Sequence, residues 1–186
     1  NLGVESVAKG FLGRQTGEYI NSRLRDEKIA TDFLFIENPT RTNTKVVDNR
    51  NGTCTDINEP GEPVSEEAVR KLEGKLFSGL KKGDIVVFAG KGTPGMPDTL
   101  VGEWTTRCKF LGVRVFVDAE KQMLVHSMEA CPFLIKPNIE ELEEAIGEKL
   151  SSVWEITVAC RKLVERGITM VALSMGSRGA MFFSAD

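Results

Sequence analysis

The sequence contains few of the residues that mark several classes of protein. It has one histidine, one tyrosine and four cysteines in 186 residues, and no two cysteines form a C-x-x-C pair. The wide cysteine spacing suits reduced thiols in a cytoplasmic protein, and a disulfide framework is not expected at this length. The lone His126 lies in a polar segment, so we expect it to be a bystander. The cysteines are Cys54, Cys108, Cys131 and Cys160.

Long apolar runs and runs of basic residues are also missing. No stretch is apolar enough to predict a transmembrane segment, and no export signal is recognisable. The net charge is −3, and no Lys/Arg cluster predicts a nucleic-acid partner. With 41% hydrophobic and 27% charged residues, the composition is that of a soluble globular domain with one sizeable core.

From Ser65 onward, helical and extended apolar patterns alternate. Ser65 is expected to cap a helix, Leu100 to Leu111 repeat at helical spacing, and a further helix follows from Glu140. Ser152 to Glu155 have the pattern of a capping box. Buried strands are predicted at 84–89, 113–118, 133–136 and 170–174, with a return strand at 180–183. This alternation predicts an α/β fold with a mostly parallel sheet and helices on both faces.

The first 61 residues begin with a strand and a helix and change, from Asp32, to a pattern of short extended segments. A short strand is predicted at 7–12, and Thr16 is expected to cap the next helix. Extended segments at 42–47 and 53–57 flank Asn51-Gly52, which is a strong hairpin signal. We therefore divide the chain into the start of an α/β core (1–31), a small antiparallel element (32–61) and the rest of the core (62–186). The start resembles a helix-to-strand turn and the end a hairpin turn, so the chain is expected to be a piece of a longer protein.

Polar and glycine-rich segments follow each of four predicted strands. Ligands of an open parallel sheet bind at the carboxyl ends of its strands, so these segments predict one phosphate and metal site. The segments are Gly90 to Gly95, Asp118 with Glu120, Lys136-Pro137-Asn138 with Glu140 and Glu141, and Ser174 to Gly179.

Each of these segments also has a purely structural explanation. Gly90 to Gly95 and Ser174 to Gly179 can be turns that need positive φ, and Asp118 can cap the helix after it. The acidic residues from Glu140 onward can form a solvated helix face. A P-loop is excluded, because Ile85 stands where that motif needs glycine. The functional interpretation depends on the four segments meeting at one end of the sheet.

Three of the motifs resemble those of the ribokinase-like, or phosphofructokinase B, family of carbohydrate kinases. Lys136 to Leu142 are similar to its K-P-N-x-x-E-L segment, and Ser174 to Ala180 to its S-L-G-x-x-G-A nucleotide-binding turn. Thr40 to Val46, followed by Thr55 to Gly61, resemble the T-R-x-N-x-K and T-D-x-N-x-P-G pattern of the 1-phosphofructokinase and tagatose-6-phosphate kinase branch. The resemblance covers the whole chain.

The resemblance implies an enzyme that transfers phosphate from ATP, with Mg²⁺, to a sugar phosphate. Fructose 1-phosphate is the first candidate acceptor, with tagatose 6-phosphate and fructose 6-phosphate as others. The antiparallel element would then be a β lid that covers the sugar and pairs subunits in a homodimer. The implied substrate-binding residues are Arg41, Asn43, Lys45, Gly90 and Lys91. The implied nucleotide-binding residues are Lys136, Asn138, Ser174, Gly176 and Gly179, and the implied metal-binding residues are Glu141 and Asp118.

The chain also departs from the family pattern. Lys91 stands where the family has a serine that touches substrate, and Ala119-Glu120 follow Asp118 in place of Thr/Ser-Ser. The family's G-G-K-G-x-N segment would precede Asn1, and its G-A-G-D segment, with the catalytic Asp, would follow Asp186. The 186 residues alone are therefore expected to be nearly inactive. Two alternatives stay open: a catalytically dead protein that binds nucleotide or sugar phosphate, and a nucleoside or simple-sugar kinase. Arg41 speaks against the second, since an unphosphorylated substrate needs no such cation.

Overall fold

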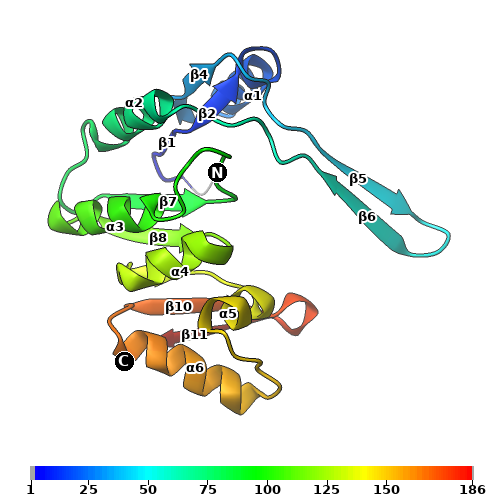
Figure 1. The fold of residues 1–186 in the computed structure, drawn as a ribbon, viewed down its shortest axis with the longest axis vertical. Helices are drawn as coiled ribbons and strands as arrows, with labels where there is room; N and C mark the ends of the chain where they lie inside the picture. Colours follow the sequence, from blue (N-terminus) through cyan, green and yellow to red (C-terminus); the bar gives the residue numbers. More distant parts are fainter. Residues whose placement is uncertain (1–2, 186) are drawn as a thin grey trace. The chain divides into compact units, whose positions relative to one another are not determined.

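The computed structural model describes residues 3–185, without the side chain of Gln15, as two compact units (Figure 1). Unit 1 comprises Asn1–Ser78 with Thr93–Met96, and unit 2 comprises Gly79–Gly92 with Pro97–Asp186. The expected turns at the two ends involve Asn1, Leu2 and Asp186, which lie outside the described residues. The main boundary between the two units follows Ser78. The division expected from the sequence, into 1–31, 32–61 and 62–186, remains a prediction.

Unit 1 contains short strands, two helices and a hairpin. Strands β1 and β3 pair in parallel, as do β2 and β4, while β5 and β6 form an antiparallel hairpin. The elements are β1 (Val7–Ala8), β2 (Phe11–Gly13), α1 (Arg14–Asp26), β3 (Ala30–Thr31), β4 (Leu34–Ile36), β5 (Asn43–Asp48), β6 (Thr53–Asn58) and α2 (Glu66–Phe77).

Two expectations for this unit are wrong in detail. The strand predicted at 7–12 is divided at Gly10 into β1 and β2. Helix α1 begins at Arg14 with Gly13 as its N-cap, so Thr16 lies inside the helix. The amide of Gly13 donates to Thr40 Oγ1 at 2.8 Å, and a Cβ at Gly13 would lie 2.3 Å from the Asn38 carbonyl oxygen. The long-range contact with residues 38–40 therefore replaces the expected local cap.

Helix α2 is tied to strands β1 and β3 by a cluster of three charges. The Asp32 carboxylate is paired with both Lys9 and Lys75, and the Lys9 ammonium also donates to the Lys75 carbonyl. The hydrogen bond from Lys75 lowers the pKa of Asp32, with a further contribution from Lys9, against the opposing effect of desolvation. Unit 1 thus has an ionic link in addition to its small apolar core.

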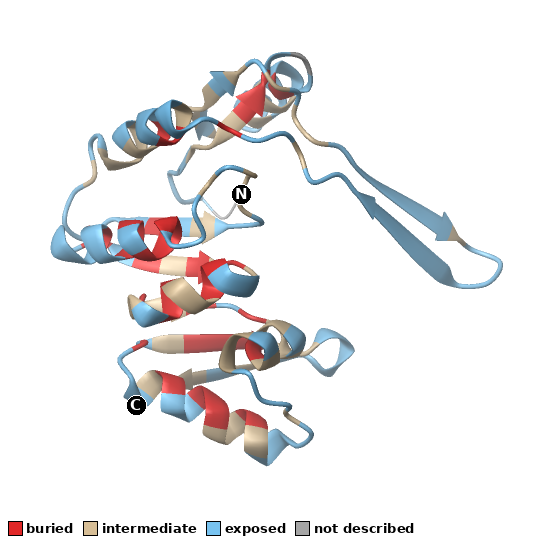
Figure 2. Ribbon diagram, in the orientation of Figure 1, coloured by how far each residue is buried: buried red, intermediate tan, exposed pale blue. Residues whose placement is uncertain are grey.

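The β5–β6 hairpin exposes both of its faces (Figure 2). Its register places Val46 opposite Thr55 and Thr44 opposite Ile57, so Val46 and Ile57 lie on one face. Lys45 and Asp56 lie on the other face, where Lys45 Nζ is 3.3 Å from Asp56 Oδ1. The first face also carries Thr44 and Thr55, and the second also carries Val47, so each face mixes apolar and polar side chains. The hairpin contributes no buried residue to the core.

Unit 2 contains a five-stranded sheet in the order β11-β10-β9-β8-β7. Strands β7 to β10 are parallel, and β11 pairs antiparallel with β10 as the predicted return strand. The strands are β7 (Ile85–Ala89), β8 (Arg114–Asp118), β9 (Leu134–Ile135), β10 (Met170–Ser174) and β11 (Ala180–Ser184). The helices are α3 (Leu100–Phe110), α4 (Lys121–Glu129), α5 (Ile139–Ile146) and α6 (Val153–Glu165), with a 3₁₀ turn at Gly176–Arg178.

Local capping signals fix where several helices begin. Ser65 accepts from the Ala68 amide, and Ser152 with Glu155 forms a reciprocal capping box. Asn138 with Glu141 forms a second box at the start of α5. These caps satisfy amides that a helix leaves unpaired at its first turn. The expectations for Ser65 and Ser152 are therefore confirmed.

The core of unit 2 lies between the sheet and the inner stripes of its helices (Figure 2). Burial of each large apolar side chain contributes about 1.5–3 kcal/mol. Leu124, Ile135, Leu142 and Leu173 are completely buried. On β7, however, Ile85 and Val87 are 48% and 59% exposed. One face of β7 is thus open in the described residues, although its apolar run predicts cover on both.

None of the helices in the described part of the chain has the length and apolar character needed to cross a membrane.

Candidate functional site

The carboxyl ends of β7, β8, β9 and β10 meet at one edge of the unit 2 sheet. Main-chain hydrogen bonds join them: Gly90 N donates to Asp118 O at 3.0 Å, and Lys136 N donates to Val117 O at 2.9 Å. Ser174 N donates to Pro137 O at 2.9 Å. We call this edge the strand-end rim, formed by Gly90, Asp118, Lys136, Asn138, Glu141 and Ser174. The structure therefore brings together the residues that were expected to share a phosphate and metal site.

Asp118 and Lys136 form an ion pair across the rim. The distance from Lys136 Nζ to Asp118 Oδ2 is 3.0 Å, and the two side chains are 49% and 40% exposed. Asp118 is the last residue of β8, and the N-cap of α4 is Glu120, so the alternative that Asp118 caps this helix is wrong. The pair leaves both charges open to solvent and to a ligand.

The next strand end is organised by Asn138. Its side-chain Oδ1 accepts from the Glu141 amide, and its own amide donates to Glu141 Oε2, each at 2.8 Å. Asn138 also forms an isolated parallel bridge with Ser174 at the end of β10. One side chain thus anchors the start of α5, while its backbone joins two strand ends.

A glycine turn connects β10 to β11. Gly176 and Gly179 have φ values of 58° and 87°, and the Met175 amide donates to the Gly179 carbonyl at 2.8 Å. Nothing lies within 4 Å of a Cβ built at either glycine. Glycine is therefore needed for its backbone conformation, and the space above the turn is open to a ligand.

Two exposed lysines lie at the ends of β7 and β8. Lys91 follows Gly90, whose φ is 92°, and Lys121 begins α4 with a φ of 56°. Neither side chain forms an ion pair or hydrogen bond within residues 3–185. Lys121 was not singled out from the sequence, because positive φ is expected at glycine or asparagine and no local signal predicts it at lysine.

The other expected substrate residues belong to unit 1. Arg41 is half-buried beside Gly61 and makes no ion pair in the described part of the chain. Asn43 begins β5, and Lys45 is engaged with Asp56, whose hydrogen bond raises the pKa of Lys45. Arg41 thus carries a free cation, whereas the Lys45 charge already has a partner.

The rim has the donor groups for a magnesium ion that keeps most of its water. Within residues 3–185, no cluster of three His, Cys, Asp or Glu side chains is arranged to hold a metal. Mg²⁺ usually binds through one or two carboxylates together with water and substrate phosphates, so such a cluster is not required. Asp118 is partly exposed, and Glu141 uses Oε2 in the capping box, while its Oε1 accepts no hydrogen bond within residues 3–185. Both carboxylates are oxygen donors of the kind that Mg²⁺ binds, and their metal role remains a prediction.

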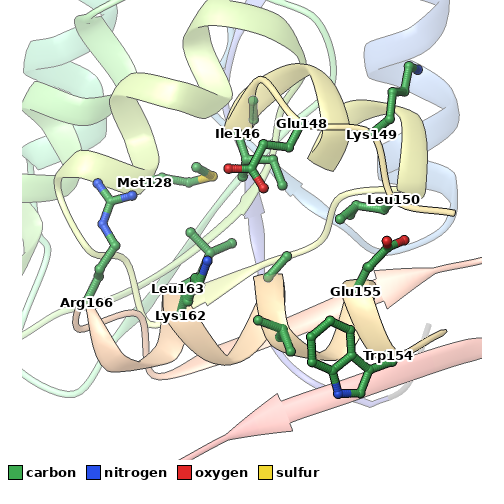
Figure 3. A pocket seen from close by; sticks show the side chains of 13 residues that line it. Met128, Ile146, Glu148, Lys149, Leu150, Trp154, Glu155, Lys162, Leu163 and Arg166 are labelled. Carbon is green, nitrogen blue, oxygen red and sulfur yellow. The ribbon is translucent and has the colours of Figure 1, made fainter. Parts of the chain in front are cut away.

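A separate pocket of about 480 Å³ lies among α4, α5 and α6 (Figure 3). Met128, Leu163, Lys162 and Arg166 line it, together with the exposed Trp154. No residue of the strand-end rim lines this pocket. The pocket is therefore not part of the candidate site.

A parallel sheet whose strand ends carry glycine turns, lysines and carboxylates is a fold suited to phosphorylated ligands. The model of the pfkB family of carbohydrate kinases matches residues 1–186, and the chain belongs to this family.

Its similar relatives include two bacterial sugar-phosphate kinases. It is 38% identical over 183 residues to 1-phosphofructokinase of Bacillus subtilis and 35% identical over 182 residues to that of Borreliella burgdorferi. Each alignment covers 98% of this chain but only 59% and 58% of the relative. The chain thus spans less than two thirds of the length of these relatives.

Solved structures show the same fold. Phosphofructokinase-2 from Escherichia coli, in complex with substrates and products, matches this chain with a TM-score of 0.93 and 26% sequence identity. The match covers 100% of this chain and 61% of the phosphofructokinase-2 chain. A possible 1-phosphofructokinase from Thermotoga maritima matches with a TM-score of 0.88 and 28% sequence identity, and the match covers 99% of this chain and 59% of the other. The ribokinase-like α/β fold expected from the sequence is therefore confirmed.

Proposed function

We propose that the protein containing this chain transfers a phosphoryl group from ATP to a sugar phosphate, with fructose 1-phosphate as the first candidate acceptor. One observation carries the proposal: three neighbouring strand ends present a lysine–aspartate pair, an Asn138–Glu141 box and a glycine turn at one edge. Phosphoryl transfer depends mainly on positioned charge, and the rim supplies it.

The nucleotide would lie over the ends of β9 and β10. Lys136 would neutralise phosphate oxygens, and Asn138 with Ser174 would position the triphosphate above the turn at Gly176 and Gly179. Magnesium, held by Asp118 and Glu141 through water or directly, would neutralise charge on the bridging phosphates. The chain's own residues thus bind and orient the donor, and the proposal assigns no general base within residues 1–186.

The residues that we propose for the acceptor are those that the family resemblance implies. Gly90 and Lys91 follow β7, and Arg41, Asn43 and Lys45 belong to the lid region of unit 1. A guanidinium binds phosphate through two parallel hydrogen bonds, so Arg41 is suited to a phosphate already on the sugar. The names of the 1-phosphofructokinase relatives support fructose 1-phosphate, while tagatose 6-phosphate and fructose 6-phosphate remain candidates.

We further propose a cytoplasmic homodimer. The four cysteines are unpaired, which suits a reducing compartment. Val46 and Ile57 lie on one face of the hairpin and are each more than half exposed. Neighbouring exposed apolar side chains of this kind support pairing with a second copy. A related phosphofructokinase-2 structure is described as tetrameric, which supports oligomerisation within the family.

A direct assay tests the activity. The full-length protein is expected to release ADP from ATP with fructose 1-phosphate and more slowly with the other two sugar phosphates. Absence of turnover with all three would favour the alternative of a catalytically dead binding protein. Phosphorylation of an unphosphorylated sugar or nucleoside, in preference to any sugar phosphate, would favour a simple-sugar or nucleoside kinase.

Substitution of Arg41 tests the acceptor assignment. Arg41→Ala is expected to raise KM for the sugar phosphate about tenfold to a hundredfold, because a charge-assisted hydrogen bond is lost, with little change in KM for ATP. Arg50→Ala is the matched control, since Arg50 is exposed in the β5–β6 turn. Equal loss of affinity for both substrates in Arg41→Ala would contradict the assignment.

A further inference from the structure

We infer that the pocket among α4, α5 and α6 is a binding site for a small amphipathic anion, with an aromatic body and one carboxylate, sulfonate or phosphate group. The pocket has a volume of about 480 Å³, and no residue of the strand-end rim lines it. All of its lining residues belong to unit 2. The inference therefore concerns a second site and does not rest on the proposed function.

The size and the floor of the pocket suit a small molecule. Binding sites for such ligands have volumes of about 300–1,000 Å³ and are mostly apolar, with a few polar groups that fix the orientation. Met128, Ala159 and Leu163 are the most buried lining residues, at 6%, 9% and 2% exposure. The half-buried Ile146 and Leu150 line the pocket from the end of α5 and the loop after it. An apolar ligand body placed on these side chains is removed from water.

One ridge of α6 runs along the pocket. Trp154, Val158, Lys162 and Arg166 follow one another at intervals of four residues, and all four line the pocket. Side chains at this spacing form a continuous ridge on a helix, and twelve residues of helix span about 18 Å. The ridge is aromatic at its start and cationic at its end. A ligand lying along it would place its body toward Trp154 and its anionic group toward Arg166.

Trp154 supplies an exposed aromatic surface at one end of this ridge. Its side chain is 73% exposed, and the neighbouring Val153 is 58% exposed. Single exposed apolar residues are common, but a tryptophan that lines an apolar pocket while remaining open to solvent offers a flat face for stacking. The exposed ring therefore favours an aromatic body over an aliphatic one.

Two free cations lie at the other end of the ridge. Within residues 3–185, neither the Lys162 nor the Arg166 side chain makes an ion pair or a hydrogen bond. Residues four apart on a helix have Cβ atoms about 5–6 Å apart, so both side chains can reach one anionic group. Cations in the last turn of a helix also stabilise its dipole. That role does not require them to line a pocket, as both of these residues do.

The other charged groups of the lining leave an excess of positive charge. Lys149 Nζ is 2.6 Å from Glu143 Oε2, and the Glu155 carboxylate accepts hydrogen bonds from two amides at the start of α6. Glu148 extends from the loop after α5 into the pocket and makes no ion pair in the described part of the chain (Figure 3). Two free cations therefore face one free carboxylate, which favours an anionic ligand and predicts that Glu148 weakens its binding.

Fluorescence titration of the full-length protein with anilinonaphthalene sulfonate tests the inference. This probe has an aromatic body and one sulfonate, and N-phenylnaphthylamine is its uncharged counterpart. The double variant Lys162→Gln/Arg166→Gln is expected to raise Kd for the sulfonate about tenfold and to leave Kd for the uncharged probe within about twofold. Glu148→Gln should act in the opposite direction and lower Kd for the sulfonate about two- to fivefold.

Two control variants fix the location of the probe. Arg161→Gln removes an exposed cation of the same helix that does not line the pocket, so it should bind both probes like the wild type. Lys136→Gln removes the lysine of the strand-end rim and should also leave both Kd values unchanged. A rise in Lys136→Gln instead of in the double variant would place the probe at the rim.

The outcomes decide the inference without any measurement of turnover. A larger Kd for the sulfonate in the double variant, a smaller one in Glu148→Gln and unchanged values in both controls support it. Absence of sulfonate binding to the wild type, or an unchanged Kd in the double variant, overturns it. An equal rise in Kd for the charged and the uncharged probe also overturns it, because the two cations would then not select an anion.

Discussion

Asn138 and Glu141 hold each other in place through two reciprocal hydrogen bonds of 2.8 Å. The box has a structural task, since it caps α5, and its Asn138 also bridges to Ser174 at the next strand end. In the proposed site, Glu141 Oε2 accepts the hydrogen bond that caps α5, and the negative charge of the carboxylate attracts the magnesium ion. Substitutions can separate these two tasks.

Glu141→Gln is expected to leave the fold intact and to impair catalysis. The amide oxygen of Gln can still accept from the Asn138 amide, so the free energy of unfolding should change by less than about 0.5 kcal/mol. Loss of the charge should raise the Mg²⁺ concentration for half-maximal activity of the full-length protein about 10- to 100-fold. Asn138→Ala, which loses the cap, should instead destabilise the chain by about 1 kcal/mol in urea unfolding. An unchanged Mg²⁺ dependence in Glu141→Gln would exclude Glu141 from the metal site.

Two helical glycines are expected to respond to alanine in opposite directions. A Cβ at Gly102 in α3 would lie 2.6 Å from the His126 carbonyl oxygen of α4, so Gly102→Ala must separate the two helices. A cost of about 1–3 kcal/mol is expected. Gly74 in α2 has nothing within 4 Å of its Cβ position, so Gly74→Ala should stabilise by about 0.5–1 kcal/mol. Urea unfolding of the 186-residue chain measures both, and a tolerated Gly102→Ala would show that α3 and α4 are not closely packed.

Thiol labelling is expected to divide the cysteines by burial. Desolvation raises the pKa of Cys108 to about 11 and that of Cys160 to about 12. Because the thiolate is the reactive form, both should stay unlabelled at pH 8 in the folded chain and begin to ionise only as pH approaches these values. Cys54 is exposed and should react first with a disulfide reagent, followed by the half-buried Cys131. Rapid labelling of Cys108 without denaturant would contradict the burial of α3.

The two faces of the hairpin provide a matched test of the proposed homodimer. Ile57→Asp places a charge on the face shared with Val46, and it should convert a dimer of the full-length protein into a monomer. Val47→Asp, which lies on the opposite face and is similarly exposed, should leave the dimer intact. Sedimentation velocity distinguishes the species. A monomeric wild type, or equal effects of both substitutions, would exclude pairing through this face.

Local signals predicted much of the fold, and long-range contacts explain where prediction failed. Ser65 and Ser152 cap helices as their side chains suggest, because a cap depends only on neighbouring amides. The start of α1 was misplaced because Gly13 is fixed by Thr40, 27 residues away. Such pairing between distant segments leaves no trace in local periodicity.

The candidate site was predictable as an assembly because strand ends of a parallel sheet meet at one edge. Asp118, Lys136, Asn138, Glu141 and Ser174 come together as expected, although their roles remain predictions. The ion pair between Lys45 and Asp56 was not predicted, since it depends on the register of the hairpin. Lys121 was missed because its left-handed backbone cannot be inferred from residue type.

The exposure of the hairpin on both faces also bears on when it is ordered. A two-stranded ribbon without its own core is only marginally stable in water, so β5 and β6 need another surface to lie against. Amide protons of this ribbon should therefore exchange with solvent sooner than those of β8 or β10, whose apolar side chains are buried. Contact of the hairpin with a ligand or with a neighbouring subunit would slow that exchange. The exchange rate of the β5 and β6 amides therefore measures whether the hairpin is covered.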